Sequence, residues 1–458
     1  MSTAHRPSFF GFPLSLIHFA SPMTSNPNSL WRHADFMKLW TGQTVSQFGS
    51  MVTRDALPLI GVLVLRASPW QMGLLSAAGA APVLLFGLLA GAWADRLRRR
   101  PILIVADLSR AVLVASIPLA ALFGRLGLAQ LIVVAALAGS LTVFFDVAYQ
   151  AFLPSLVAPE QVFEGNSKLS LTGSLAEIVV PGITGLLVQT ISAPLTLVVD
   201  AISFLGSAVS LLWIRAAEPP PPPRGPGSAV SREIGEGLRA AWGQPLLRAL
   251  AVSTAWRDFF GSFYGALYSL YVLQVLGLTP LALGLLIASG GLGALFGAAL
   301  AQPLARRFGQ GPALVLAFAA MNLLGLLTPL AGGPRWLVIL LLLLPQLFGD
   351  LFRAAFEISA LSLRQAITPV HLLGRVGASV GFLVGGVGTL GLLAGGALGS
   401  AIGIRPAVWV AALGALAATL ALVFSPVPAL RQPLNSPAVV EYSDQSKGEQ
   451  HDDPDGIG

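Results

Sequence analysis

The sequence predicts an all-α membrane protein with twelve transmembrane helices in two pseudo-symmetric six-helix halves. Hydrophobic residues make up 55% of the chain and charged residues only 10%, against about 25% charged residues in ordinary soluble domains, so the chain cannot cover a water-facing surface. Apolar runs of about twenty residues, each long enough to cross a bilayer, also recur along nearly the whole length. The predicted spans are 38–65, 70–94, 101–123, 128–150, 167–190, 193–215, 248–276, 280–302, 312–332, 335–357, 376–403 and 404–426.

The basic residues of the loops predict the topology. Four arginines lie in the loop at 95–100 and two follow the span at 280–302, whereas the alternating loops hold at most one each. Because Lys and Arg are retained on the cytoplasmic side, and because the number of spans is even, we expect both termini in the cytoplasm of a bacterial cell and the spans in its inner membrane. The 27 Lys and Arg residues form no single patch, so no nucleic-acid partner is expected.

A run of prolines from Pro219 to Pro223 divides the chain into halves. When the halves are aligned on Pro69 and Pro280, Gly73 of the first meets Gly284 of the second, which favours two related halves over the alternative of chance similarity between Gly-rich helices. Residues 233–248 follow as an amphipathic helix suited to the inner membrane surface. The predicted organisation is a cytoplasmic segment at 1–36, halves at 37–215 and 248–426, a linker at 216–247 and a disordered tail at 427–458; Met1 and Met23 are both possible starts.

The composition also excludes several functions. The chain has no cysteine, its five histidines lie outside the predicted spans, and no Gly-Lys-Ser/Thr motif is present. Thiolate metal sites, a buried imidazole relay and a phosphate-binding loop for ATP are therefore excluded. We expect a protein that is not an enzyme, with no metal and no cofactor, in which a carboxylate carries any proton.

The loop after the second span carries the sharpest motif, formed by Gly91, Asp95, Arg96, Arg99 and Arg100. It resembles the loop signature of the major facilitator superfamily, Gly-x-x-x-Asp-Arg-x-Gly-Arg-Arg, and departs from it at Arg98. The resemblance implies a latch that favours the outward-open state. The alternative is a basic loop that sets topology alone.

Further stretches resemble the macrolide-efflux and enterobactin-exporter branch of that superfamily. These are 39–49, 106–111, 148–157, 199–204 and 373–376. The resemblance implies the major facilitator fold and export of a drug or siderophore coupled to protons. It also implies a central cavity among the spans at 38–65, 128–150, 167–190, 248–276, 280–302, 335–357 and 376–403. Pro181, Gly182 and Gly185 resemble part of the antiporter motif, and physically they predict a kink with close helix packing.

Carboxylates inside the spans are the candidates for proton coupling, because a charge at the bilayer centre costs about 2.5–3.5 kcal/mol unless it is paired or hydrated. Asp55 and Glu177 are the foremost candidates, followed by Asp200 and Asp258. The alternative is a static ion pair with Arg54 or Arg257 that only holds helices together.

Two further groups of charges lie toward the predicted cytoplasmic ends of their spans. Asp107 and Arg110 are three residues apart, and Asp350, Arg353 and Glu357 share one helical face. We interpret both groups as inner-gate ion pairs, with purely structural pairing as the alternative. Candidates for the substrate cavity are Gln47, Arg54, Arg257, Phe260, Tyr264 and Tyr268.

The expected function is export of a lipophilic small molecule by proton antiport through alternating access. The expected partners are this substrate, protons and the lipid bilayer, and the protein is expected to be monomeric. Export of one native siderophore or metabolite is the nearest alternative. A non-transporting membrane scaffold or receptor is the alternative from a different class.

Overall fold

The computed structural model describes residues 30–94, 97–216, 218 and 230–430. Most of the predicted N-terminal segment, the proline run and most of the tail lie outside these residues. The described part is helical, with these bounds: α1 Ala34–Leu63, α2 Pro69–Ala94, α3 Arg99–Leu122, α4 Leu128–Leu156, α5 Val162–Thr190, α6 Ala193–Leu212, α7 Val230–Gly243, α8 Pro245–Leu270, α9 Pro280–Phe308, α10 Gln310–Gly325, α11 Leu327–Leu330, α12 Arg335–Leu344, α13 Asp350–Ile367, α14 Leu373–Ile402 and α15 Ile404–Val423.

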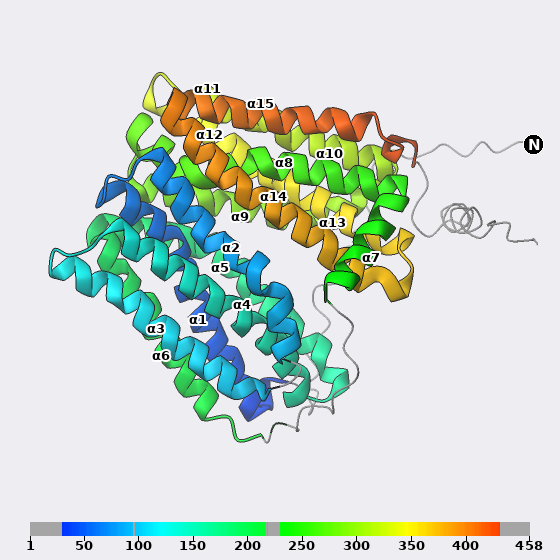
Figure 1. Ribbon diagram of the computed structural model, residues 1–458. Helices are drawn as coiled ribbons and strands as arrows, with labels where there is room; N and C mark the ends of the chain where they lie inside the picture. Colours follow the sequence, from blue (N-terminus) through cyan, green and yellow to red (C-terminus); the bar gives the residue numbers. More distant parts are fainter. Residues whose placement is uncertain (1–29, 95–96, 217, 219–229, 431–458) are drawn as a thin grey trace, which may run out of the picture.

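Every predicted span corresponds to a helical segment in Figure 1. Within the described residues, ten helical segments are long and apolar enough to cross a membrane. The two remaining spans are α1 and α8, and both carry an Arg-Asp pair that lowers their apolar character. Several helices run past the predicted spans, for example α4 to Leu156 and α13 to Ile367, because a helix continues into water after its apolar run has ended.

Local sequence explains where several helices begin and bend. Pro69 and Pro280 occupy first helical positions, where the missing N–H is unneeded, and Thr279 Oγ1 accepts a hydrogen bond from Ala282 N at 3.2 Å. In the predicted span 335–357 the helix is interrupted by a π-helical turn from Pro345 to Gly349, between α12 and α13. Proline removes a backbone donor from the helix, and the turn directs Gln346 toward the interior.

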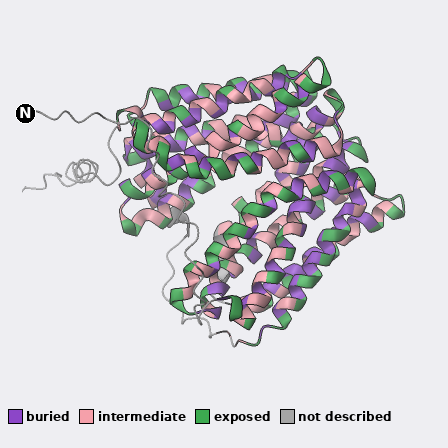
Figure 2. Ribbon diagram, turned by 180° about the vertical axis from the view of Figure 1, so that it is seen from behind, coloured by how far each residue is buried: buried purple, intermediate pink, exposed green. Residues whose placement is uncertain are grey.

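The helices form two groups, α1–α6 and α8–α15, in which most helices other than α2 and α5 pack mainly on members of their own group. The groups are joined chiefly by α5 against α9 and α2 against α14. They converge at the end where α2 and α9 begin and diverge toward the end that carries α7, as Figures 1 and 2 show. The charge pattern predicts that this diverging end is cytoplasmic. The division into two halves stays a prediction, and this packing supports it.

The predicted amphipathic helix at 233–248 corresponds to α7, and its place on the inner membrane surface stays a prediction. Helix α7 ends at Gly243 and packs on α14 and α8. Arg375 of α14 donates to Glu236 at 2.7 Å, and Ala241 is fully buried, whereas Trp242 is exposed. Part of the apolar side of α7, at Ala241, therefore faces protein, whereas Trp242 does not.

Candidate functional site

A cavity of about 530 Å³ lies among α1, α5, α8, α9, α10, α13 and α15. It gathers five residues that sequence reasoning singled out for substrate or proton binding, namely Arg54, Asp55, Arg257, Tyr264 and Tyr268. Asp350 and Arg353 line it as well. The cavity therefore brings together charges from helices that are far apart in the sequence.

The helices around this cavity differ from those implied by the resemblance. The cavity is not lined by α4 or α14, and it takes residues of α10 and α15 instead. Helix α4 packs against α2 and α3, and α14 packs against α2 and α8. On α14, Gly391 and Gly396 allow this close packing, because a Cβ at either position would collide with the backbone of α8 or α2.

Arg-carboxylate pairs provide the charge of the cavity. Arg54 Nε lies 3.4 Å from Asp55 Oδ1, and Arg353 Nε lies 2.8 Å from Asp350 Oδ1. The side chain of Arg54 is 56% exposed, whereas that of Asp55 is only 13% exposed. Asp55 Oδ2 is buried without a hydrogen-bond partner among the described residues. Asp55 is therefore the less completely compensated carboxylate of the two pairs.

The structure brings Asp350, Arg353 and Glu357 together, and their role as an inner gate stays a prediction. The ion pairs exist, since Arg353 also lies 3.1 Å from Glu357 Oε1. However, Asp350 and Arg353 line the cavity itself, because the π-helical turn that precedes α13 turns this face inward.

The four proton-coupling candidates lie in different environments. Asp55 lines the cavity, and Glu177 is exposed but close enough to interact electrostatically with Asp55. Asp258 pairs with Arg257 at 3.0 Å and is not among the lining residues. Asp200 is fully buried on α6 and accepts a hydrogen bond from Ser203 Oγ at 3.0 Å.

Asp107 and Arg110 form a buried ion pair inside the α1–α6 group. The Arg110 guanidinium lies between the rings of Phe145 on α4 and Phe204 on α6, at 4.3 and 4.4 Å from their centroids. The pair is enclosed by helices of one group and does not join the two groups in this structure, and its role as an inner gate stays a prediction. Asp146, which sequence reasoning missed, also interacts electrostatically with Arg110. An acidic residue within the predicted span 128–150 was the available signal.

Two predicted cavity residues lie elsewhere. Phe260 packs in an aromatic cluster with Trp256, Phe259 and Phe263, and Trp256 Nε1 donates to Gly414 O of α15 at 3.0 Å. Gln47 is exposed and absent from the lining. Among the aromatic residues of α8, those that reach the cavity are Tyr264 and Tyr268, one helical turn apart.

The cavity also contains polar residues that the sequence did not single out. Asn322 lies on α10, Thr328 lies on the short helix α11 that follows it, and Gln346 lies in the π-helical turn. An isolated amide inside an apolar span was the signal for Asn322, and a Pro-Gln pair for Gln346. Together with the tyrosines they surround the charges with hydrogen-bonding groups.

Pro181 and Gly185 lie where α5 meets α9, and both also line the cavity. A Cβ at Gly284 of α9 would collide with the carbonyl oxygen of Pro181, and one at Gly185 would lie 2.5 Å from the carbonyl oxygen of Pro280. A Cβ at Gly182 would touch only the Leu285 side chain, at an ordinary 3.5 Å. Pro181 and Gly185 thus belong to the closest contact between the two groups.

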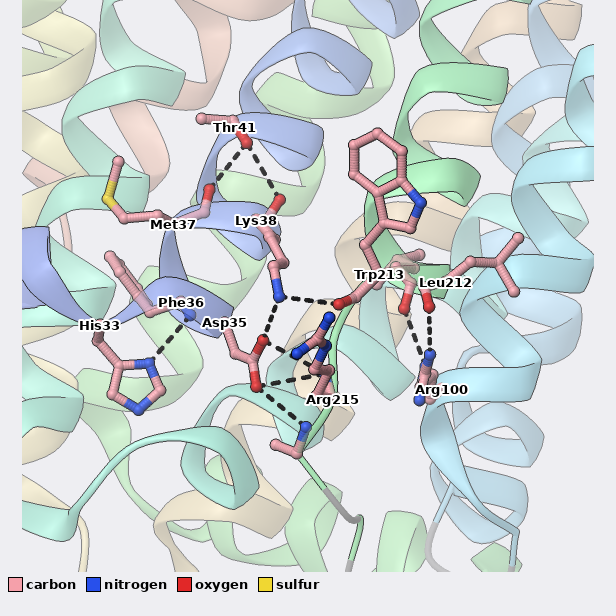
Figure 3. Close-up of polar contacts among 12 residues, drawn as sticks. His33, Asp35, Phe36, Met37, Lys38, Thr41, Arg100, Leu212, Trp213 and Arg215 are labelled. Atoms are coloured by element: carbon pink, nitrogen blue, oxygen red, sulfur yellow. Dashed lines mark hydrogen bonds and ion pairs between the residues drawn. The ribbon is translucent and has the colours of Figure 1, made fainter.

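The loop motif is described only in part, since Asp95 and Arg96 lie outside the described residues and Gly91 is located only as part of α2. The backbone amides of Arg99 and Arg100 donate to the Glu218 carboxylate at 2.6 and 3.2 Å. The Arg100 side chain donates to the carbonyl oxygens of Leu211 and Leu212 at 2.9 and 2.8 Å, as Figure 3 shows. These arginines therefore join the start of α3 to the end of α6.

The fold and the cavity together define a polytopic membrane transporter of small molecules with a polar central site. The chain belongs to the family of transmembrane secretion effectors in the major facilitator superfamily, whose profile matches residues 25–449. Its relatives place it in the efflux branch of that superfamily, which confirms the resemblance drawn from the loop motif and the stretches around it.

Relatives and solved structures agree with this assignment. The chain is 31% identical over 388 residues to the multidrug efflux pump Tap of Mycolicibacterium fortuitum, covering 82% of this chain and 92% of the relative. It is 24% identical over 358 residues to the enterobactin exporter EntS of Escherichia coli O127:H6, covering 77% and 82%. A bacterial homologue of the iron transporter ferroportin in an inward-facing state shares the fold, with a TM-score of 0.69, 18% identity and coverage of 86% of this chain and 98% of that chain.

Proposed function

We propose that this protein exports a lipophilic small molecule across the bacterial inner membrane in exchange for protons. Its relatives include a protein named as a multidrug efflux pump and another named as an enterobactin exporter. The observation that carries the proposal is the cavity, in which Tyr264 and Tyr268 offer apolar ring surface beside the charges of Asp55 and Asp350. Both a lipophilic body and polar substituents find partners there.

Asp55 is the residue that we propose to carry the proton. A carboxylate within the membrane must be paired, hydrated or protonated. Asp55 is paired only with the largely exposed Arg54, at 3.4 Å, and its second oxygen has no hydrogen-bond partner among the described residues. Proton binding and substrate binding then compete in one cavity, because the charge of Asp55 contributes to the site that holds the substrate. Such competition couples the two fluxes.

The proposal includes alternating access, with the two groups rocking about the central cavity and both termini in the cytoplasm. The divergence of the groups toward the α7 end supports an inward-facing arrangement for this conformation. A monomer as the working unit is part of the same proposal.

The test uses inside-out membrane vesicles energised to an acid interior, with the full chain and a fluorescent pH reporter. Addition of ethidium or enterobactin is expected to dissipate the pH gradient in wild type, and Asp55→Asn is expected to lower the rate at least about tenfold. Glu164→Gln is the matched control, since the Glu164 carboxylate is also paired with a basic residue, Lys168 at 3.0 Å, but neither residue lines the cavity. It should retain the wild-type rate.

A second measurement separates coupling from binding. Exchange of labelled against unlabelled substrate without a gradient should persist in Asp55→Asn at a raised substrate concentration, because exchange needs the cavity but no proton, while loss of the Asp55 charge weakens substrate binding. Loss of both activities would assign Asp55 to substrate binding instead. Dissipation by a single compound would favour a dedicated siderophore or metabolite exporter, and no dissipation by folded protein would favour the scaffold or receptor.

A further inference from the structure

A second hollow, of about 580 Å³, lies on the outside of the α1–α6 group between the start of α3 and the end of α6. Figure 1 shows these two helices side by side at the edge of the molecule, and no residue of either helix lines the central cavity. Three arginines line it together with apolar side chains and one carboxylate: Arg98, Arg100 and Arg215, with Pro101, Ile104, Val105, Leu212, Ala216 and Glu218. We refer to it as the α3–α6 groove.

The α3–α6 groove carries an excess of positive charge. The Glu218 carboxylate accepts hydrogen bonds from the backbone amides of Arg99 and Arg100. Arg100 donates to the carbonyl oxygens of Leu211 and Leu212 (Figure 3). These neutral acceptors hold the guanidinium in position but contribute no negative charge to offset it. Arg98 and Arg215 are exposed beside it.

The nearby acid outside the groove adds little opposing charge. Asp35 lies at the start of α1, where its carboxylate binds Lys38 at 2.7 Å and accepts from the backbone amides of Arg215 and Ala216 (Figure 3). Lys38 thus balances the charge of Asp35, and the arginines of the groove remain available to an anion.

An apolar path leads from these arginines along the membrane-facing surface. Val105 of α3 is 61% exposed and Leu212 of α6 is 56% exposed, and both line the groove. Further along the same helices, Val112 and Leu205 are exposed as well. An exposed apolar strip that begins at a cluster of arginines is suited to a molecule with an anionic head and a hydrocarbon chain.

We propose that the α3–α6 groove binds an anionic phospholipid, with the phosphate between Arg98, Arg100 and Arg215 and an acyl chain along Val105 and Leu212. Planar guanidinium groups bind phosphate oxygens through paired hydrogen bonds. The groove lies toward the end of the molecule that carries α7, which the charge pattern predicts to be cytoplasmic, and the anionic lipids of that leaflet are attracted by basic residues. A free phosphate ion would share the headgroup chemistry but would leave the apolar strip uncovered.

Trp213, which is 67% exposed at the end of α6, provides a reporter beside the groove. Full-length protein is reconstituted into phosphatidylcholine vesicles that contain a small fraction of phosphatidylglycerol or phosphatidylcholine brominated near the headgroup. The Trp213 signal is the wild-type fluorescence minus that of Trp213→Phe. Brominated phosphatidylglycerol is expected to quench it at about one-fifth of the concentration that brominated phosphatidylcholine requires, since one basic residue near the surface contributes about fivefold in binding.

The variant Arg98→Gln/Arg215→Gln should lose this preference, whereas Arg306→Gln/Arg307→Gln, at the end of α9 and outside the groove, should keep it. Far-ultraviolet circular dichroism shows that each variant is folded. Equal quenching by the two lipids in wild type, or an unchanged preference in the groove variant, would overturn the proposal. Loss of the preference on addition of millimolar inorganic phosphate, at constant ionic strength, would assign the site to free phosphate instead.

Discussion

At the scale of single residues, Arg110 shows how a charge is held inside the membrane domain. Its guanidinium pairs with Asp107 and stacks on Phe145 and Phe204, and Arg110 is only 3% exposed. A buried ion pair adds little net stability, but removal of one partner leaves an uncompensated charge. We therefore expect Arg110→Gln to destabilise the protein by about 3–5 kcal/mol, measured by unfolding in mixed micelles.

The double variant Asp107→Asn/Arg110→Gln tests the cause of this loss. Because it removes both charges, it should recover much of the stability lost in Arg110→Gln. Arg335→Gln serves as the control, since Arg335 is exposed at the start of α12 and its loss should change stability by less than about 0.5 kcal/mol. An Arg110→Gln protein as stable as that control would show that the pair is dispensable.

At the scale of elements, the start of α1 is fastened to the end of α6 by Asp35, as Figure 3 shows. Burial alone would raise the pKa of the Asp35 carboxyl, but hydrogen bonds from Lys38 and from the amides of Arg215 and Ala216 outweigh it and leave the pKa below the ordinary 3.8. Asp35 precedes the predicted span at 38–65. Because the pKa of Asp35 is lowered, the hydrogen bonds and the ion pair of its carboxylate stabilise the fold above about pH 4. This stabilisation is lost as pH falls through the lowered pKa.

The melting temperatures of wild type and Asp35→Asn, measured in detergent between pH 7 and pH 3, test this fastening. The wild type should be more stable by about 1 kcal/mol at neutral pH, with a constant difference down to about pH 5. The difference should then shrink below pH 4, because Asp35 becomes protonated and resembles the amide. A difference that grows on acidification would contradict the assignment.

At the scale of the whole molecule, glycines set how closely the two groups approach at their converging end. Gly284 of α9 packs directly on Pro181 of α5, and Gly73 of α2 packs on Gly396 of α14. A methyl group at Gly284 must separate these helices, at a cost of about 1–3 kcal/mol. If the groups rock as we propose, Gly284→Ala should shift the population about five- to hundredfold toward the arrangement that is open at this end.

Distances between spin labels measure this shift. The chain has no cysteine, so Phe163→Cys on α5 and Phe308→Cys on α9, both exposed at the diverging ends, can be labelled without background. The label distance should shorten in Gly284→Ala and stay unchanged in Gly206→Ala, where a Cβ meets open space. An unchanged distance in Gly284→Ala would mean that this contact does not set the conformation.

The sequence by itself determined the number and order of the spans, the family and the presence of charges within the membrane. These properties are local, because hydropathy and a contiguous motif can be read from neighbouring residues. The spacing of Asp107 and Arg110 likewise sufficed to predict that they pair.

Only the tertiary structure decided what each pair faces. Asp107 with Arg110 and Asp350 with Arg353 have the same i,i+3 spacing, yet the first pair is enclosed by α3, α4 and α6 while the second lines the central cavity. Spacing assigns two side chains to one face of a helix, whereas the neighbours of that face depend on contacts between distant segments. The same reason explains why Asn322 and Gln346 became part of the site only when the helices were packed.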